Sequence, residues 1–269
     1  MNIDSNKINR ASIFALAVCL ATALSGCGGT KLLKEQKSME VTTSIATTNS
    51  DELFGSLDWV IVRDGPGTWA KNADWDEYLV TIVNETDTEV HISGVTVVDL
   101  LGNRLEPESQ RKSLVKGTKR TAKRYKDEHI EVKAGVGTGT LIAAGAAVGV
   151  VGTAVAVGAA QAAVLTGAST AGGAAAAAGG VVLLAPVLVV GGIVRGVNNS
   201  KVGKRIESRH TAMPAAVEAD GIRQLDLFFP LAPSPQRVEI AYVSASGEGV
   251  LIIETTQALN GLHLVPGTL

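Results

Sequence analysis

Residues 77–99 have the sequence EYLVTIVNETDTEVHISGVTVVD. Apolar and polar side chains alternate on both sides of a polar turn at 84–87, as in Val80 and Ile82 before it and Val95 and Val97 after it. A period of two residues is typical of an antiparallel strand with one buried face, and Asn, Thr and Asp favour a tight connection. This stretch therefore predicts two neighbouring strands of a β domain.

Similar short runs rich in Val, Ile and Thr occur at 57–63 upstream, and at 223–229, 237–244 and 249–255 far downstream. Together they supply six or seven strands with the spacing of an immunoglobulin-like sandwich. Residues 78–105 resemble the small Ig-like modules of bacterial envelope proteins, a resemblance that implies no functional residues. The predicted fold is mainly β: an Ig-like antiparallel β-sandwich, with halves at 51–106 and 211–269, interrupted by an α-helical hairpin rich in Gly and Ala.

Composition excludes two broad classes of protein. A chain of 269 residues with 46% hydrophobic residues has ample material for a buried core, so disorder throughout is excluded. A formal net charge of −2 argues against a general nucleic-acid binder, which would carry a basic excess.

The N-terminus has the features of a secretory signal peptide over residues 1–26: Lys7 and Arg10 precede an apolar run at 11–24. The run ends in Leu24-Ser25-Gly26-Cys27, which resembles the lipobox of bacterial lipoproteins. That resemblance implies cleavage before Cys27 and a diacylglyceryl group on its thiol, and Gly28 in place of Asp implies an outer-membrane anchor facing the periplasm. The alternative is an ordinary signal peptide cut between 21 and 25. Residues 27–50 are expected to be a flexible tether spanning roughly 25 to 30 Å on average.

The insertion begins with a basic segment at 107–134, expected to be an exposed helix or loop. The 61 residues between Lys133 and Arg195 then carry no ionisable side chain. Two arms, 140–161 and 174–194, would each measure about 32 Å as helices, close to the thickness of a bilayer core. The sequence therefore predicts a helical hairpin over 135–197 that enters a membrane, or whose arms pack on each other or in an oligomer.

Small residues at helical spacing would let the arms approach closely: Gly145, Gly149, Gly152, Ala156, Gly192 and Gly196. The segment resembles the glycine-zipper hairpins of small Gram-negative envelope lipoproteins, which implies membrane association and self-association. A basic flank at 198–210 follows the hairpin, so basic residues lie on both sides of it in the sequence. Basic residues on the two sides are expected to contact anionic phospholipid headgroups: Lys119, Arg120, Lys123, Arg124, Arg195, Lys204 and Arg205.

No catalytic or metal-binding pattern is present in the sequence. The four histidines lack metal-ligand spacing, and the only cysteines are Cys19 and Cys27. No dinucleotide-binding or nucleophile-elbow motif is complete. Asp74, Asp76 and Glu77 around Trp75 could bind a cation weakly, but a solvated loop is the commoner state of such a cluster. We therefore expect no metal, no cofactor and no enzymatic activity.

Three functional hypotheses remain. The first is a non-enzymatic outer-membrane lipoprotein whose hairpin inserts into membrane or self-associates, with membrane lipid, a second copy or another envelope protein as partner. The second is a periplasmic protein-binding module, such as a secretion-system component or an immunity-type factor, acting through loops such as residues 64–77. The third is an enzyme assembled from scattered residues.

Overall fold

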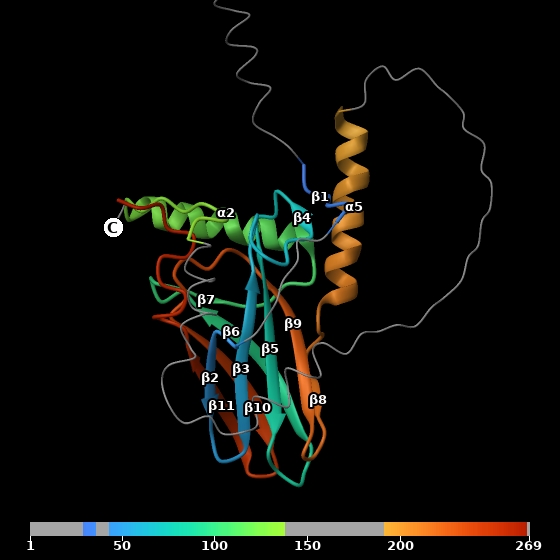
Figure 1. Cartoon of the computed structure of the whole chain (residues 1–269), viewed down its shortest axis with the longest axis vertical. Helices are drawn as coiled ribbons and strands as arrows, with labels where there is room; N and C mark the ends of the chain where they lie inside the picture. Colours follow the sequence, from blue (N-terminus) through green and yellow to red (C-terminus); the bar gives the residue numbers. More distant parts are fainter. Residues whose placement is uncertain (1–28, 36–42, 138–190, 268–269) are drawn as a thin grey trace, which may run out of the picture.

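Two antiparallel sheets face each other in the computed structural model, which describes residues 29–35, 43–137 and 191–267 (Figure 1). One sheet has four strands in the order β2 (Ala46–Asn49), β3 (Leu53–Ile61), β5 (Asp76–Asn84) and β9 (Ile222–Phe229). In the other sheet β11 (Gly247–Glu254) pairs with β10 (Arg237–Ser244), and β10 pairs with β6 (Val90–Val98). The short strands β7 (Arg104–Leu105) and β8 (Ala215–Val217) pair with the other edge of β6.

Strands from before and after residues 107–210 pair directly with one another. β9 pairs with β5 along its whole length, and β10 pairs with β6. Inward-facing side chains from both sheets, such as Tyr78, Ile82 and Ile240, form one hydrophobic cluster between them. The prediction of a mainly β fold built from antiparallel strands is confirmed, and all six predicted strands are present.

The structure differs from the tether expected over residues 27–50. β1 (Lys31–Leu32) pairs with β4 (Ala70–Lys71), and β2 pairs with β3. Thr30 and Ile45 are buried. β2 extends the edge of the four-stranded sheet, and β1 forms a separate two-stranded sheet with β4, so backbone pairing holds both parts of the segment. A count of polar residues in the sequence does not reveal this pairing.

Two helices are described. α2 (Arg111–Asp127) lies across one end of the sheets, and α5 (Gly191–Arg209) runs from that end down beside β9 (Figure 1). Leu114 of α2 joins Val202 and Ile206 of α5 in a second hydrophobic cluster, with Trp69, Trp75 and Phe228. The basic segment and the basic flank are therefore packed helices with one buried side, rather than wholly solvated segments.

The two arms of the predicted hairpin lie almost wholly outside the described residues, as do Gly145, Gly149, Gly152 and Ala156. Gly192, Arg195 and Gly196 belong to the first turns of α5. Among the described residues, neither helix combines the length and the apolar character that crossing a membrane requires.

Candidate functional site

The candidate site is the end of the domain that carries α2, here called the α2 end. It consists of α2, residues 29–33 and β4, and Figure 1 shows the first turns of α5 on the same side. This end collects three features that the sequence analysis treated separately: the segment after Cys27, the basic helix, and the two described borders of the uncharged segment.

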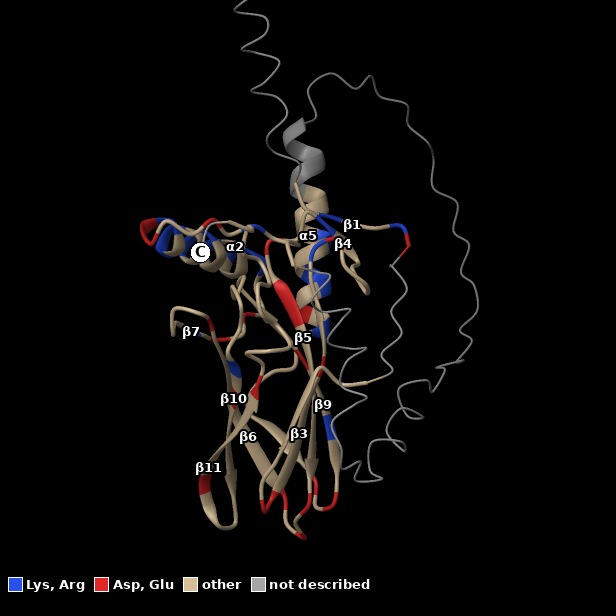
Figure 2. Ribbon diagram, turned by 60° about the vertical axis from the view of Figure 1, so that its left-hand side comes forward, with Lys and Arg blue, Asp and Glu red and all other residues tan. Residues whose placement is uncertain are grey.

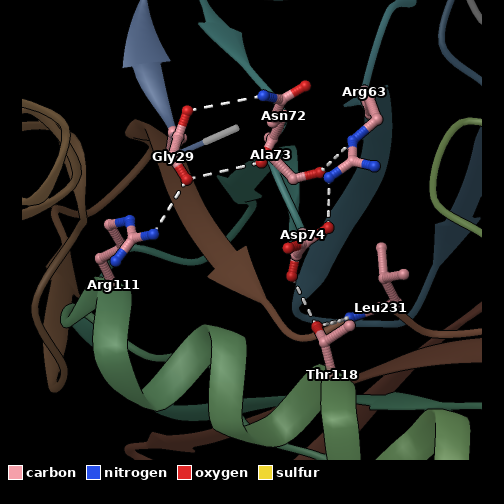
Figure 3. A network of polar contacts seen from close by, with 9 residues as sticks. Gly29, Arg63, Asn72, Ala73, Asp74, Arg111, Thr118 and Leu231 are labelled. Carbon is pink, nitrogen blue, oxygen red and sulfur yellow. Dashed lines mark hydrogen bonds and ion pairs between the residues drawn. The ribbon is translucent and has the colours of Figure 1, made fainter. Parts of the chain in front are cut away.

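The chain is fixed to this end from its first described residue (Figure 3). The Asn72 side-chain amide donates to the Gly29 carbonyl at 3.5 Å, and the Arg111 guanidinium donates to the Thr30 hydroxyl at 3.0 Å. The Leu33 amide donates to the Trp69 carbonyl at 2.9 Å. Burial lowers the pKa of Arg111. Gly29 is two residues after Cys27 in the sequence, so at most about 7 Å of backbone can join the two residues.

The buried side of α2 holds the helix rigidly to the sheets. Leu114 and Tyr125 are fully buried. The Thr118 hydroxyl donates to the Asp74 carbonyl at 2.6 Å and accepts from the Leu231 amide at 3.0 Å (Figure 3). The Tyr125 hydroxyl accepts from the Leu101 amide and donates to the Pro233 carbonyl, each at 3.3 Å. Contacts near both ends of the helix fix its orientation.

The opposite side of α2 is basic and exposed. Residues 111–126 contain eight Lys or Arg and no Asp or Glu. At about 100° per residue, Lys112, Lys116, Lys119 and Lys123 all lie within about 40° of the direction opposite the mean of the helix's buried residues, which are Leu114, Gly117, Thr118, Thr121 and Tyr125. All four side chains are exposed. We call these four residues the α2 lysine face.

The predicted basic residues divide into three groups. Lys119 and Lys123 belong to the α2 lysine face, whereas Arg120 lies beside it and Arg124 turns toward the β6–β7 turn, where it donates to the Asn103 side chain at 3.3 Å. Lys204 and Arg205 are exposed but lie on the half of α5 that packs beside the four-stranded sheet. For Arg195 only the backbone is described, in the first turns of α5.

Basic residues gather along α2, which ends at the acidic residues Asp127 and Glu128, and acidic loops gather at the other end of the domain (Figure 2). The loops at 50–52, 85–89 and 218–221 meet at the end away from α2, because the Glu85 amide donates to the Glu52 carbonyl and the Asn84 side chain donates to the Glu218 carbonyl. We call them the distal loops. They carry seven carboxylates and no Lys or Arg: Asp51, Glu52, Glu85, Asp87, Glu89, Glu218 and Asp220.

A partly buried charged cluster fastens the last residue of α5 to the four-stranded sheet. Arg209 forms ion pairs with Glu77 of β5 and with Asp226 of β9, the latter at 3.1 Å. Its guanidinium lies 5.9 Å from the centre of the Trp69 ring, and the Trp69 indole donates to Glu77 at 2.6 Å. Burial and the neighbouring Glu77 carboxylate raise the pKa of Asp226 to about 8. We call this the Arg209 cluster.

The acidic group around Trp75 is therefore not a solvated loop, which corrects the sequence interpretation. Asp76 and Glu77 are the first two residues of β5, and both are buried. Because side chains alternate along a strand, the Asp76 side chain lies between the sheets, where its carboxylate is 2.8 Å from His263 Nε2. The Glu77 side chain lies on the opposite face of the sheet and pairs with Arg209. Asp74 pairs with Arg63. Each carboxylate has a different basic partner, so the three do not converge on one cation.

The buried Asp76–His263 pair resembles half of a catalytic triad, but no nucleophile of the described residues is hydrogen-bonded to its free ring nitrogen. His263 Nδ1 is buried and has no hydrogen-bond partner within the described part of the chain. The nearby Ser234 hydroxyl instead contacts the Asn260 side chain and accepts from the Gly261 amide. The cavity beside Trp69, Trp75 and Glu77 has room for about one water molecule. In residues 29–35, 43–137 and 191–267 no three His, Cys, Asp or Glu side chains are grouped to hold a metal ion.

Sequence analysis missed two parts of this site. The buried stripe of α2 was present as Leu114, Thr118 and Tyr125 at spacings of four and seven. A signal for the Arg209 cluster was the charged pair Asp76-Glu77 at the start of an apolar strand, although Arg209 is more than 130 residues away from Glu77.

The comparisons with known proteins found no match: no family model, no curated protein and no solved structure matches this chain.

Proposed function

We propose that this protein is a non-enzymatic lipoprotein of the bacterial outer membrane, anchored through Cys27 and facing the periplasm, with a structural or assembly role in the cell envelope. Its β domain is an Ig-like sandwich in this proposal, supported by the two facing antiparallel sheets with their shared core. Residues 135–197 supply the membrane-inserting or self-associating hairpin. Membrane lipid is the first partner, and a second copy or another envelope protein is the next.

The observation that carries this proposal is the docking of residues 29–33 onto the α2 end. A lipid on Cys27 would hold that end against the membrane surface, since at most about 7 Å of backbone joins Cys27 to Gly29. The basic residues of α2 belong to the same end. The lipid anchor and the basic helix therefore favour the same orientation of the domain.

The alternative function, protein binding through residues 64–77, has less support. Trp69, Ala73 and Trp75 of that loop are buried in the second hydrophobic cluster, against side chains of α2 and α5. The loop is thus part of the framework of the α2 end. A binding module would have to use other surfaces, such as the distal loops.

Mass spectrometry of the mature N-terminus in the native envelope tests the anchor. We expect a diacylglyceryl-modified Cys27, and we expect Cys27→Ser to abolish labelling by a fatty-acid analogue, because no other cysteine remains after cleavage. An unmodified N-terminus at another residue would refute the lipoprotein.

Membrane insertion needs a separate test, because a lipid anchor alone sediments with membranes. The Cys27→Ser chain should stay with vesicles through an alkaline carbonate wash. Replacing Val187 and Val190 with Lys should release it, since two central charges cost on the order of 5 to 7 kcal/mol against roughly 6 kcal/mol from the apolar side chains of the second arm. A Cys27→Ser chain that is soluble and monomeric before any further change would refute insertion and self-association.

A further inference from the structure

We propose that the α2 lysine face binds the headgroups of an anionic phospholipid bilayer, with α2 lying parallel to the membrane surface. The proposal rests on the proposed function for the nearby lipid anchor, but it concerns a surface that binds whether or not Cys27 is lipidated. It assigns the membrane contact to one face of one helix, rather than to all basic residues on the two sides of the hairpin.

The charges of this face are available for a partner. Lys112, Lys116, Lys119 and Lys123 are exposed, and none of them forms an ion pair within the described part of the protein. The first acidic residue of the helix is Asp127, at its last position. Asp127 is one turn after Lys123, so the four ammonium groups face a single carboxylate of the helix and their net positive charge attracts an anionic partner.

The shape of the face favours an extended surface over a compact anion. Eleven residues separate Lys112 from Lys123, which is about 16 Å along a helix. Leu114, Thr118 and Tyr125 fix the helix to the sheets, so the four lysines cannot gather around one small ligand. A planar array of headgroups can meet all four at once.

The rest of the domain favours the same orientation. Arg111 at the start of α2 holds Thr30, so the first described segment after Cys27 is fixed to the helix that carries the lysine face (Figure 3). The seven carboxylates of the distal loops lie at the other end of the domain (Figure 2). An anionic membrane would repel these carboxylates and keep that end away from its surface. Attraction at one end and repulsion at the other both turn α2 toward the membrane.

The first experiment compares two variants of the chain that begins at residue 27 and carries Cys27→Ser. In one, Lys112, Lys116, Lys119 and Lys123 are changed to Gln. In the matched control, four exposed basic residues elsewhere are changed to Gln: Lys201, Lys204, Arg205 and Arg223. Both variants lose the same charge, and circular dichroism verifies that both fold.

Binding is measured with vesicles of phosphatidylethanolamine containing about one-third phosphatidylglycerol, at low and at physiological salt. Each lysine near an anionic surface contributes about fivefold in affinity, so at low salt the α2 variant should bind about 600-fold more weakly and the control variant no more than about fivefold more weakly. Equal losses for the two variants, or no loss for either, would overturn the proposal. Equally tight binding to soluble polyglutamate would also overturn it, in favour of an acidic protein partner.

A second experiment measures the orientation of the β domain relative to the membrane. It is valid even if the uncharged segment between Lys133 and Arg195 also binds the protein to the vesicle. A single cysteine replaces Asp127 at the end of α2 or Asp87 in the distal loops of the Cys27→Ser chain, and each carries a fluorophore. Both positions are exposed and both changes remove one carboxylate, so the two labelled chains are matched in charge. A nitroxide on the lipid headgroup should quench the label at 127 strongly and the label at 87 little.

Equal quenching at the two positions, or stronger quenching at 87, would refute the proposed orientation. A failure of Cys27 lipidation in the native envelope would leave the results of both experiments unchanged, because both use the Cys27→Ser chain. The lysine face and the lipid anchor can therefore fail independently.

Discussion

Replacing Arg209 with Met should release the end of α5 from the four-stranded sheet. The substitution keeps most of the side-chain length but leaves Glu77, whose side chain is 2% exposed, without its positive partner. Removing one member of a buried ion pair costs about 3 to 5 kcal/mol, and the contact with Trp69 adds about 0.5 to 1 kcal/mol. Since Arg209 and Asp226 are each about one-quarter exposed, we expect a loss of about 2 to 4 kcal/mol in the free energy of unfolding.

Urea unfolding of the Cys27→Ser chain in a non-ionic detergent measures this loss, with tryptophan fluorescence as the signal because Trp69 lies in the cluster. Arg209→Lys is the matched control, since it keeps the charge and loses only the forked geometry, and it should cost about half as much. Adding Glu77→Leu to Arg209→Met should recover part of the stability, because the fully buried carboxylate is then removed and only the one-quarter exposed Asp226 remains without its partner. A loss below about 0.5 kcal/mol for Arg209→Met would show that the cluster does not hold α5.

Three further predictions concern single residues. Asp226→Asn should flatten the pH dependence of the free energy of unfolding. The pKa of Asp226 is about 8 in the folded state and 3.8 ordinarily, so protonated Asp226 stabilises the fold fully below about pH 4 and this stabilisation is lost toward pH 8, with a slope of at most about 1.4 kcal/mol per pH unit. An unchanged slope in urea titrations at several pH values would contradict this. Gly117→Ala should destabilise the fold by about 1 to 3 kcal/mol in thermal unfolding, because its Cβ would lie 2.4 Å from Pro230 Cγ, and an unchanged midpoint would show that Pro230 moves aside. Arg111→Met should speed amide exchange at residues 29–33 by removing the hydrogen bond to Thr30, whereas exchange equal to that of the parent chain would mean that β1 alone holds the segment.

The regular parts of the β domain could be predicted from local pattern. Alternation at Val80 and Ile82, and again at Val95 and Val97, places these side chains on the inner faces of β5 and β6, and all four are buried. Tyr78 of β5 and Phe229 of β9 also lie in the cluster between the sheets. A period of two identifies a buried face without any knowledge of which strand pairs with which.

The candidate site could be predicted only in part, because its residues come from distant segments. Sequence analysis identified Lys119 and Lys123 as membrane-surface candidates by their charge alone, but it did not separate them from Arg124, which turns toward Asn103. It also assigned residues 27–50 to a tether, since nothing local shows that β4 offers Lys31 a free edge.

By itself the sequence determined the kinds of segment in this protein and their order. These are an apolar run that ends before Cys27, strands with one buried face, a basic segment and an uncharged segment. These are properties of neighbouring residues, and short-range periodicity and charge are sufficient to define them. The tertiary structure alone decided that the segment after Cys27, the lysines of α2 and the start of α5 lie at one end, opposite the acidic distal loops. It also decided that Glu77 and Asp226 share Arg209. Contacts across more than 100 residues depend on which strands pair and which helix covers them, and no local pattern encodes that choice.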